Sequence, residues 1–379
     1  MATINDKQTM KRYFILILIF TIYQACKSPK KENISDIESI EINVKDTISQ
    51  IDITPFVEKV VHIKLETREA CLLRNVKKIV VNPSELLVFD GFVYVFDLDG
   101  KFKFKVGRHG KGPGEILEGF DFVTDSKTGN IEIYDFRQNK LVIFTKDGTF
   151  LTEKKNIRLH GITRFEKLEN GDYVVMQSLS NIPINDNGLL GYKICVGNFE
   201  NGFTQHRPLY KHQFDSNMTI NQSFTKRGNH LYYIDVLNDT IFEVKNRKEF
   251  SRAFYVDFGK NKMPKELLKL PPDSRIYALR DNVNVATLVD NFYYWGDHIY
   301  FNYLHNGNRW NVLKINGQLH ISKHIRYNDI TFPRFNYFDG EKVLASIVYP
   351  DRMNMSLKKV FKTTPSISDN PIITLFYLN

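Results

Sequence analysis

The sequence predicts an all-β protein, a six-bladed β-propeller with four-stranded antiparallel blades and a ring closed by N- and C-terminal strands. Three observations lead to this prediction. The chain of 379 residues contains 29 Phe, 19 Tyr and 2 Trp, interleaved with Ile and Val, which favours half-buried strands over helices. Short strand-like segments recur at a spacing of about fifty residues. Asp-Gly and Asn-Gly pairs separate many of them, as tight hairpins require.

Matching segments reveal the repeat. Residues 131–144 (IEIYDFRQNKLVIF) and 231–242 (LYYIDVLNDTIF) each resemble a strand that ends in aspartate, a short linker and a second strand. Residues 95–102 and 143–150 each place an Asp-Gly turn between two strands, and Asn316-Gly317 forms a similar turn later in the chain. A period of about forty to fifty residues with this content is typical of propeller blades. An irregular β-sandwich is the alternative, which the regular spacing disfavours.

The repeat divides the chain into five consecutive blades and a composite sixth. The five are expected near residues 75–105, 118–155, 160–205, 222–258 and 285–325. The sixth is expected to combine residues 330–378 with an N-terminal strand from residues 38–66. Pairing the two chain ends in this way would remove the exposed sheet edge that an open array leaves.

One segment interrupts the β pattern. Pro264 begins a run of good helix formers within residues 262–269, and Pro271-Pro272 is expected to end it. We therefore expect a short helical excursion on the loop between the fourth and fifth blades. It either decorates the rim or forms a lid over the central funnel.

The first residues are typical of an export signal. Lys11 and Arg12 precede an apolar run over residues 13–23, and Ala25 lies immediately before Cys26. This pattern predicts a bacterial lipoprotein signal in which Cys26 becomes the lipidated first residue. A plain secretory peptide with an incidental cysteine is the alternative.

The expected organisation follows from this signal. Residues 1–25 form the lipoprotein signal peptide, residues 26–37 a lipidated tether, and residues 38–379 the propeller. We expect an outer-membrane lipoprotein of the cell envelope. Because the tether begins with basic residues, whereas surface export signals tend to be acidic after the cysteine, a periplasm-facing anchor is favoured over surface exposure.

Charge and cysteine content narrow the possible partners. The formal net charge is +9, but the lysines are scattered and export argues against nucleic acid as a partner. Acidic glycans or lipid headgroups are the more plausible partners of a mildly basic exported protein. We expect the protein to be a monomer. Beyond the lipidated cysteine, Cys71 and Cys195 either pair once or stay as buried thiols. The second is expected, since two cysteines do not form a disulfide framework.

The stretch GRHGKGPGE at residues 107–115 holds four glycines and a proline. A phosphate cradle would need Gly-x-x-x-x-Gly-Lys-Ser/Thr running into a helix, whereas a strand pattern follows here. We therefore interpret the stretch as a crossing between the first two blades, in which glycines supply positive φ and Pro113 stiffens the turn. Its charged side chains, expected near the funnel mouth, are the candidate ligand-binding residues: Arg108, His109, Lys111 and Glu115.

The sequence holds no recognisable catalytic or metal-binding constellation. His320 and His324 are expected on one face of a strand, and His206 and His212 flank a loop, but neither pair has a carboxylate at ligand spacing. An axial calcium or zinc ion held by several blades would leave no local signature, so the cofactor stays open. A Gly-x-Ser-x-Gly elbow is also missing. We favour binding over catalysis.

Two further groups of residues have both a structural and a functional interpretation. Asp135 and Asp235 occupy equivalent blade positions, where a carboxylate is expected to accept hydrogen bonds from turn N–H groups. Four aromatic residues either stack on sugar rings or belong to the blade core: Tyr294, Trp295, Tyr303 and Trp310.

Together these features resemble a family of six-bladed β-propeller lipoproteins from Gram-negative bacteria, related in architecture to NHL-repeat and TolB-like propellers. The resemblance is carried by the Cys26 signal, the Gly110–Glu115 loop, the Asp135…Asn139…Leu141 pattern and the closing Asp369-Asn370-Pro371. It implies a fold and an envelope address, and it transfers no catalytic residue. The chain departs from the pattern at Asp90-Gly91, which shortens a turn, and at Tyr303, which replaces an expected aspartate.

These expectations converge on a lipid-anchored binding or scaffolding module of the cell envelope. A rigid ring that presents loops over a funnel suits recognition of a glycan, a peptide or a partner protein. The alternative is an NHL-like lyase or hydrolase with an axial metal. A third possibility is an envelope assembly partner like the TolB-like propellers.

Overall fold

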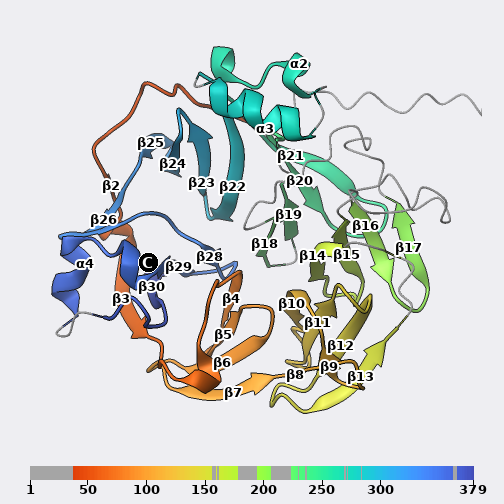
Figure 1. The fold of residues 1–379 in the computed structure, drawn as a ribbon. Coiled ribbons are helices and arrows are strands. Elements are labelled where there is room, and N and C mark those ends of the chain that lie inside the picture. Colours follow the sequence, from red (N-terminus) through yellow and green to blue (C-terminus); the bar gives the residue numbers. More distant parts are fainter. Residues whose placement is uncertain are drawn as a thin grey trace, which may run out of the picture. The chain divides into compact units, whose positions relative to one another are not determined.

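Figure 1 shows the computed structural model of the chain. It describes residues 37–155, 159, 162–177, 194–205, 223–228, 230–234, 237–268, 270, 272–282, 284–361 and 365–379. The chain falls into two compact units, Met1–Glu38 and Ser39–Asn379, and nearly all described residues belong to the second. The predicted signal peptide, Cys26 and most of the tether lie outside the described residues.

The strands of the second unit form antiparallel sheets arranged in a ring (Figure 1), which confirms the predicted β-propeller. Five of these sheets follow one another along the chain, with the first strand of each nearest the axis. The first holds β4 (Lys78–Val81), β5 (Glu85–Phe89), β6 (Val93–Asp97) and β7 (Phe102–Val106). The second holds β10 (Gly119–Thr124), β11 (Ile131–Asp135), β12 (Lys140–Phe144) and β13 (Phe150–Lys154).

The next three sheets complete this series, and all five lie where the repeat predicts them. The third holds β14 (Ile162–Lys167), β15 (Tyr173–Gln177), β16 (Ile194–Asn198) and β17 (Gly202–Gln205). The fourth holds β18 (Phe224–Arg227), β19 (His230–Tyr233), β20 (Thr240–Val244) and β21 (Phe250–Asp257). The fifth holds β22 (Ala286–Trp295), β23 (His298–His305), β24 (Asn308–Ile315) and β25 (Gln318–Ser322).

The N-terminal segment, predicted as one strand, forms three strands in three different sheets. β1 (Glu38–Glu41) adds a fifth strand beside β21. β2 (Ile51–Asp52) pairs in parallel with β26 (Ile325–Tyr327). β3 (Val57–Lys64) pairs antiparallel with β30 (Ile372–Leu378), which confirms that the chain ends close the ring.

The described part of the chain contains seven sheets of three or more strands, so the predicted count of six blades is wrong. The closing sheet holds β28 (Tyr337–Phe338), β29 (Val343–Val348), β30 and β3. The additional sheet is short, with β2, β26 and β27 (Ile330–Phe332), and its last two strands lie between β25 and β28 in the chain. Strands of two or three residues contain too little alternation to be detected by periodicity, so the prediction merged them with their neighbours.

Turn chemistry and aromatic packing explain why these residues form blades. At Asn306-Gly307 and Asn316-Gly317 both residues have positive φ, at 50° and 66° and at 48° and 75°, as a two-residue hairpin of this type needs. Between neighbouring blades the core is aromatic, and the ring centroids of Phe89 and Phe122 lie 5.3 Å apart. Cys71 and Cys195 are buried free thiols, as expected, and burial raises the pKa of Cys195 to about 12.

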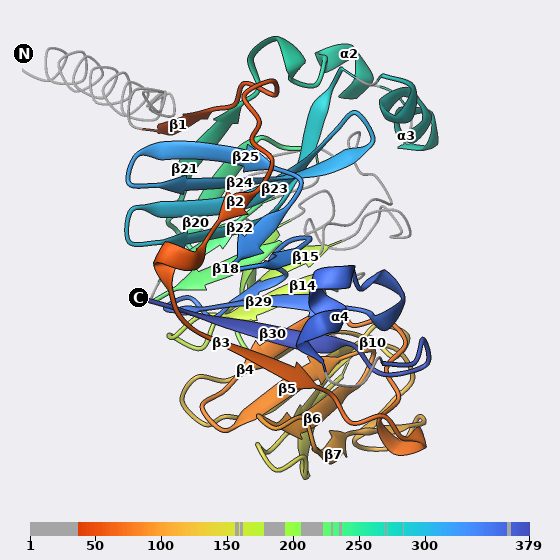
Figure 2. The same ribbon diagram turned by 90° about the vertical axis from the view of Figure 1, so that its left-hand side faces the viewer.

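Three α-helices in the described part of the chain decorate the ring. α2 (Lys265–Leu268) lies within the predicted excursion, but α3 (Pro272–Asp281) begins where the helix was expected to end. Proline fits the first turn of a helix because its missing N–H needs no partner there, so Pro272 starts a second helix. α4 (Met355–Val360) follows β29, and Figure 2 shows all three helices toward one face of the ring. No described helix has the length and hydrophobicity to cross a membrane.

Candidate functional site

The glycine loop crosses from β7 to β10 and links the first two blades, as predicted. Two short strands at the ends of the loop, β8 (Arg108–His109) and β9 (Glu115–Ile116), pair in parallel. The loop then runs into β10, a strand, as predicted. The loop lies at the outer edge of the ring beside β13 (Figure 1), not at the funnel mouth where we expected it. The reason is that the crossing starts from β7, the outermost strand of its sheet.

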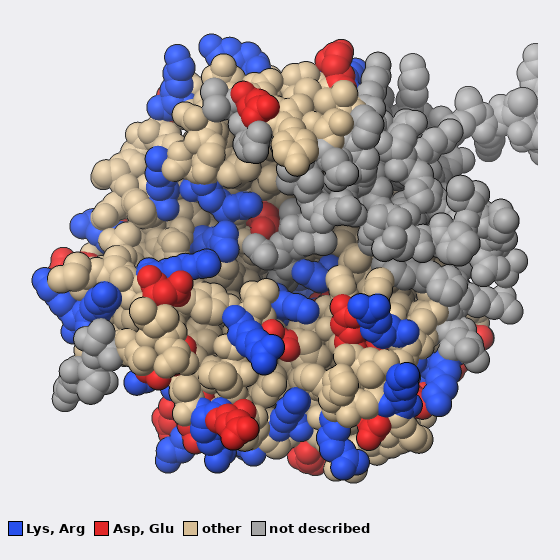
Figure 3. All heavy atoms as spheres, in the orientation of Figure 1, with Lys and Arg blue, Asp and Glu red and all other residues tan. Residues whose placement is uncertain are grey.

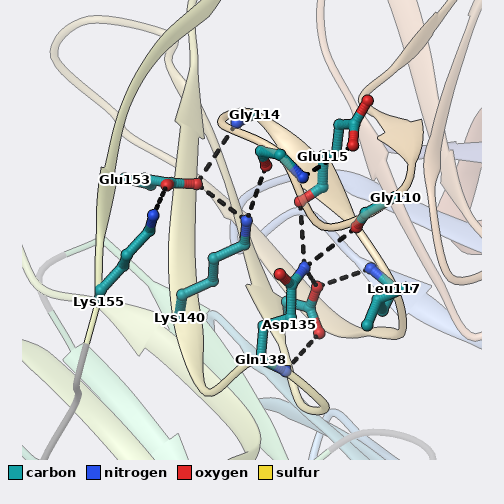
Figure 4. Close-up of polar contacts among 10 residues, drawn as sticks. Gly110, Gly114, Glu115, Leu117, Asp135, Gln138, Lys140, Glu153 and Lys155 are labelled. Atoms are coloured by element: carbon teal, nitrogen blue, oxygen red, sulfur yellow. Dashed lines mark hydrogen bonds and ion pairs between the residues drawn. The ribbon is translucent and has the colours of Figure 1, made fainter.

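Buried polar side chains hold this loop in place (Figure 4). The carboxylate of Asp135 accepts hydrogen bonds from the N–H groups of Leu117 at 2.7 Å and Gln138 at 3.1 Å. The side-chain amide of Gln138 donates to two loop carbonyls at 3.2 and 3.4 Å. Asp135 therefore has the structural role predicted for it, whereas Asp235 lies outside the described residues.

A buried ion pair fastens the same loop from its other side. Lys140, 1% exposed, places Nζ 2.9 Å from Glu153 and donates to the carbonyl of Gly112 at 3.3 Å. Glu153 also accepts from the Gly114 N–H at 3.4 Å and pairs with Lys155 at 2.7 Å. Burial acts to raise the pKa of Glu153, but hydrogen bonds from Lys155 and Lys140 outweigh it and lower the pKa to about 2.

The four predicted ligand-binding residues differ in their surroundings. Glu115 turns toward its own loop and accepts the N–H of Gly112 at 2.8 Å. Arg108, His109 and Lys111 are exposed on the outer edge. Their contact with a ligand stays a prediction.

Replacing Gly114 by alanine is expected to destabilise the propeller by about 2 kcal/mol. Gly114 has a φ of +71°, which costs a residue with a Cβ about 1 kcal/mol, and that Cβ would lie 2.7 Å from the Phe150 ring. Gly171 is the matched control, since its φ is +86° but nothing lies within 4 Å of its Cβ position. Urea denaturation of both variants separates the two contributions. Equal losses would show that the contact with Phe150 adds nothing.

A basic pocket of about 550 Å³ lies where the fifth sheet, the closing sheet and the first blade meet. It is lined by 17 described residues, of which six are Lys or Arg and none is Asp or Glu. Figure 3 shows Lys and Arg side chains gathered around the centre of this face. The six cations of the pocket are Lys77, Lys78, Arg309, Lys323, Arg334 and Arg352.

Lys78 belongs to an ion-pair network that joins the inner strands of four blades. Its Nζ donates to the carbonyl of Phe122 and to Glu166, both at 2.8 Å, and lies 3.4 Å from Asp121. Glu166 is also 3.0 Å from Lys226, so the network spans β4, β10, β14 and β18. Burial acts to raise the pKa of Glu166, but the charges of Lys226 and Lys78 lower it to about 2. With three acceptors engaged and its charge balanced by Asp121 and Glu166, Lys78 adds neither net charge nor a free N–H group to the pocket.

The other lining residues offer hydrogen-bonding groups. Asn75 and Asn336 contribute side-chain amides and His324 an imidazole, whereas the amide of Asn354 caps α4 through the Leu357 N–H. Tyr349 is held in place because its hydroxyl oxygen accepts the N–H of Val76 at 2.8 Å. Cations surrounded by amide and hydroxyl groups can bind an anion that also carries hydroxyls.

Comparison with known proteins places this propeller in a family. A model described as a domain of unknown function, DUF4934, matches residues 37–377. The chain belongs to the DUF4934 family. Its sequence matches no curated protein significantly.

Solved structures resemble this DUF4934 member in fold. A Bacteroides fragilis protein described as exported has a TM-score of 0.70 at 18% identity, over 90% of this chain and 99% of that chain. A DUF4221 protein of Bacteroides vulgatus has a TM-score of 0.50 at 10% identity, over 85% and 97%. Virginiamycin B lyase of Staphylococcus aureus has a TM-score of 0.44 at 13% identity, over 85% and 100%, which is too distant to support an argument. At these identities the similarities show the fold alone.

The predicted histidine pair does not share a strand in the DUF4934 propeller. β25 ends at Ser322, so His320 lies in the strand and His324 beyond it, where it lines the basic pocket. His206 and His212 lie outside the described residues. In the described parts of the chain, no group of three or more His, Cys, Asp or Glu residues is placed to hold a metal ion.

The aromatic residues proposed for sugar stacking lie in the blade core. Tyr303 is fully buried, and Tyr294 and Trp310 pack against the same hydrophobic cluster. Trp295 packs against a second cluster, and none of the four lines the basic pocket. Figure 1 shows α2 and α3 at the rim of the ring, and no described residue of the helical excursion lines the basic pocket.

Proposed function

We propose that this DUF4934 member is an exported, lipid-anchored binding module of the cell envelope whose basic pocket takes an anionic saccharide. The observation that supports this most directly is a lining of six cations and no described acidic residue, in which Lys77, Lys323 and Arg334 have no described carboxylate partner. Cations held close together repel one another, and an anion that enters the pocket relieves this repulsion. The same field attracts anionic ligands during diffusion.

The size of the pocket favours a small ligand over a protein surface. A volume of about 550 Å³ lies within the range of about 300–1,000 Å³ typical of small-molecule sites. One or two sugar rings, or the end of a longer chain, match such a volume. The amides of Asn75 and Asn336 suit sugar hydroxyls, which both donate and accept hydrogen bonds.

The envelope address rests on two supports. The sequence before residue 26 is typical of a lipoprotein signal, which makes Cys26 the proposed anchor. A structurally similar Bacteroides fragilis protein is described as exported. Attachment at the outer membrane on its periplasmic side remains our proposal for the location.

Calorimetric titration of the soluble domain, from about residue 33 onward, tests the proposed binding. Digalacturonate and galactose 6-sulfate are expected to bind, the neutral galactose disaccharide is not, and affinity should fall as salt rises. The Lys323→Ala/Arg334→Ala variant is expected to lose about tenfold or more in affinity. The control Lys127→Ala/Lys146→Ala removes two exposed charges outside the pocket and should bind normally.

Two results would overturn this proposal. Equal binding of the neutral and acidic sugars would show that charge does not select the ligand. Absence of binding by both acidic probes would exclude an anionic saccharide as the ligand of the pocket. Conversion of digalacturonate to an unsaturated product would instead support the NHL-like lyase alternative.

A further inference from the structure

We propose that Arg309 is the residue that fixes a carboxylate in the pocket, which makes the ligand a uronic acid, and that the distorted strand β22 holds this arginine in position. This inference rests on the proposed function and goes beyond it, because it assigns the anion contact to one side chain and the anion to one chemical class.

Strand β22 departs from regular geometry at two places. Its pairing with β23 shifts register between Thr287 and Asp290 and again between Asp290 and Tyr293. Leu288 and Asn291 have positive φ values of 55° and 52°. For a leucine in particular this backbone conformation is costly, and bulges and strained residues of this kind gather at functional sites.

Acceptors from the distorted segment of β22 and from β23 lie on one side of the Arg309 guanidinium. Its Nη1 donates to the side-chain oxygen of Asn302 at 2.7 Å and to the carbonyl of Leu288 at 3.3 Å. The carboxylate of Asp290 lies 3.8 Å away. Asn302 and Asp290 are both buried, so these acceptors are fixed before any ligand arrives.

The rest of the guanidinium remains available to the pocket. Among the described residues, neither Nε nor the second terminal nitrogen of Arg309 has a hydrogen-bond partner, and the side chain is 29% exposed where it lines the cavity. These two nitrogens present parallel N–H groups, the geometry that matches the two oxygens of a carboxylate. Because the side chain is already ordered, binding costs little further conformational entropy.

A role of Arg309 as the counter-ion of Asp290 does not by itself account for this arrangement. A charge-assisted hydrogen bond between arginine and carboxylate is typically about 2.7–2.9 Å long, and this contact is longer at 3.8 Å. Asp290 is occupied locally, because its side chain accepts the N–H of Asn291 at 2.8 Å. The short contact of Arg309 is to a neutral amide, which orients the guanidinium without cancelling its charge.

Arginine-to-lysine substitutions at two places in the pocket test the inference by titration with digalacturonate. Arg309→Lys keeps the charge but loses the paired N–H groups, so affinity is expected to fall about tenfold or more. Arg334→Lys is the matched control, since no described hydrogen bond or ion pair orients Arg334, and affinity should change about twofold or less. Equal losses in the two variants would overturn the role of Arg309.

A second measurement needs no substitution. In the wild-type domain, digalacturonate is expected to protect Arg309 from modification by phenylglyoxal, as read by mass spectrometry, and modification at an unchanged rate despite bound digalacturonate would overturn the inference. If galactose 6-sulfate binds as tightly as digalacturonate and loses equally in Arg309→Lys, the choice of a uronic acid is wrong. If wild type binds neither acidic probe, the proposed function itself has failed.

Discussion

Glu166→Gln is expected to lower the free energy of unfolding by about 3 kcal/mol, because it leaves two lysines without their shared counter-ion. Lys78 would keep only one carboxylate, Asp121 at 3.4 Å, beside the Phe122 carbonyl, and Lys226 would lose its contact of 3.0 Å. The Lys78 side chain is only 14% exposed, so water replaces the lost charge poorly. Urea denaturation followed by circular dichroism measures the loss.

A surface pair provides the control for this substitution. Glu200 is exposed and pairs with Lys154 at 2.8 Å, so Glu200→Gln is expected to cost far less than Glu166→Gln, because water replaces an exposed partner. Comparable losses at the two positions would show that the ion-pair network around Glu166 contributes no more to stability than a surface ion pair. In a double-mutant cycle, Glu166→Gln and Lys226→Gln should together cost less than the sum of their separate losses.

The pH dependence of stability provides an independent check on Glu166. Its pKa is about 2 in the folded protein, below the ordinary value of 4.5. The stability it contributes is therefore fully present above pH 4.5 and is lost as the pH falls through about 2. Between these limits the Glu166→Gln variant should lose stability less steeply than wild type. Parallel acid curves would mean that Glu166 does not titrate as its contacts indicate.

Local sequence signals predicted much of the fold. The Asp-Gly and Asn-Gly turns and the spacing of about fifty residues place five blades correctly, because a hairpin and its two strands are encoded within a few residues. The closure of β3 on β30 also followed, since a ring must pair its ends. The extra sheet could not be predicted in this way. Only two residues of β2 and two of β26 pair, they lie 274 positions apart in the chain, and no local pattern in the sequence indicates such a contact.

The basic pocket could not be predicted in the same way. Its cations come from separate segments between residues 77 and 352, and only closure of the ring brings them together. One signal was present in the sequence. Asp290-Asn291 interrupts an otherwise apolar and aromatic strand, and this polar pair marks the distorted part of β22.

The glycine loop could be recognised in the sequence by its backbone chemistry. Lys140 could not, because it looks like any surface lysine in the sequence, yet it is buried beneath the loop.

Lys140→Met is expected to destabilise the propeller by about 3–5 kcal/mol, because it leaves Glu153 charged with little solvent around it. Glu153 is 9% exposed, and its remaining partner Lys155 is itself 59% exposed. Lys155→Met is the control and should cost less than Lys140→Met, since Lys155 is exposed and its loss leaves the buried Lys140 beside Glu153. The double variant Lys140→Met/Glu153→Leu should regain most of the loss, because a buried ion pair replaced by apolar groups is often nearly neutral.

The same substitution should also change how acid unfolds the protein. Glu153 has a pKa of about 2, below the ordinary 4.5, so it stabilises the fold above pH 4.5 and loses this effect as the pH falls through about 2. Without Lys140 the pKa of Glu153 rises, because fewer hydrogen bonds then oppose the effect of burial. Acid unfolding should therefore begin at a higher pH. Since Lys140 and Glu153 also hold Gly112 and Gly114, the loop amides should exchange hydrogen faster in Lys140→Met. Unchanged exchange in the loop together with a large global loss would mean that the pair stabilises the blade but not the crossing between blades.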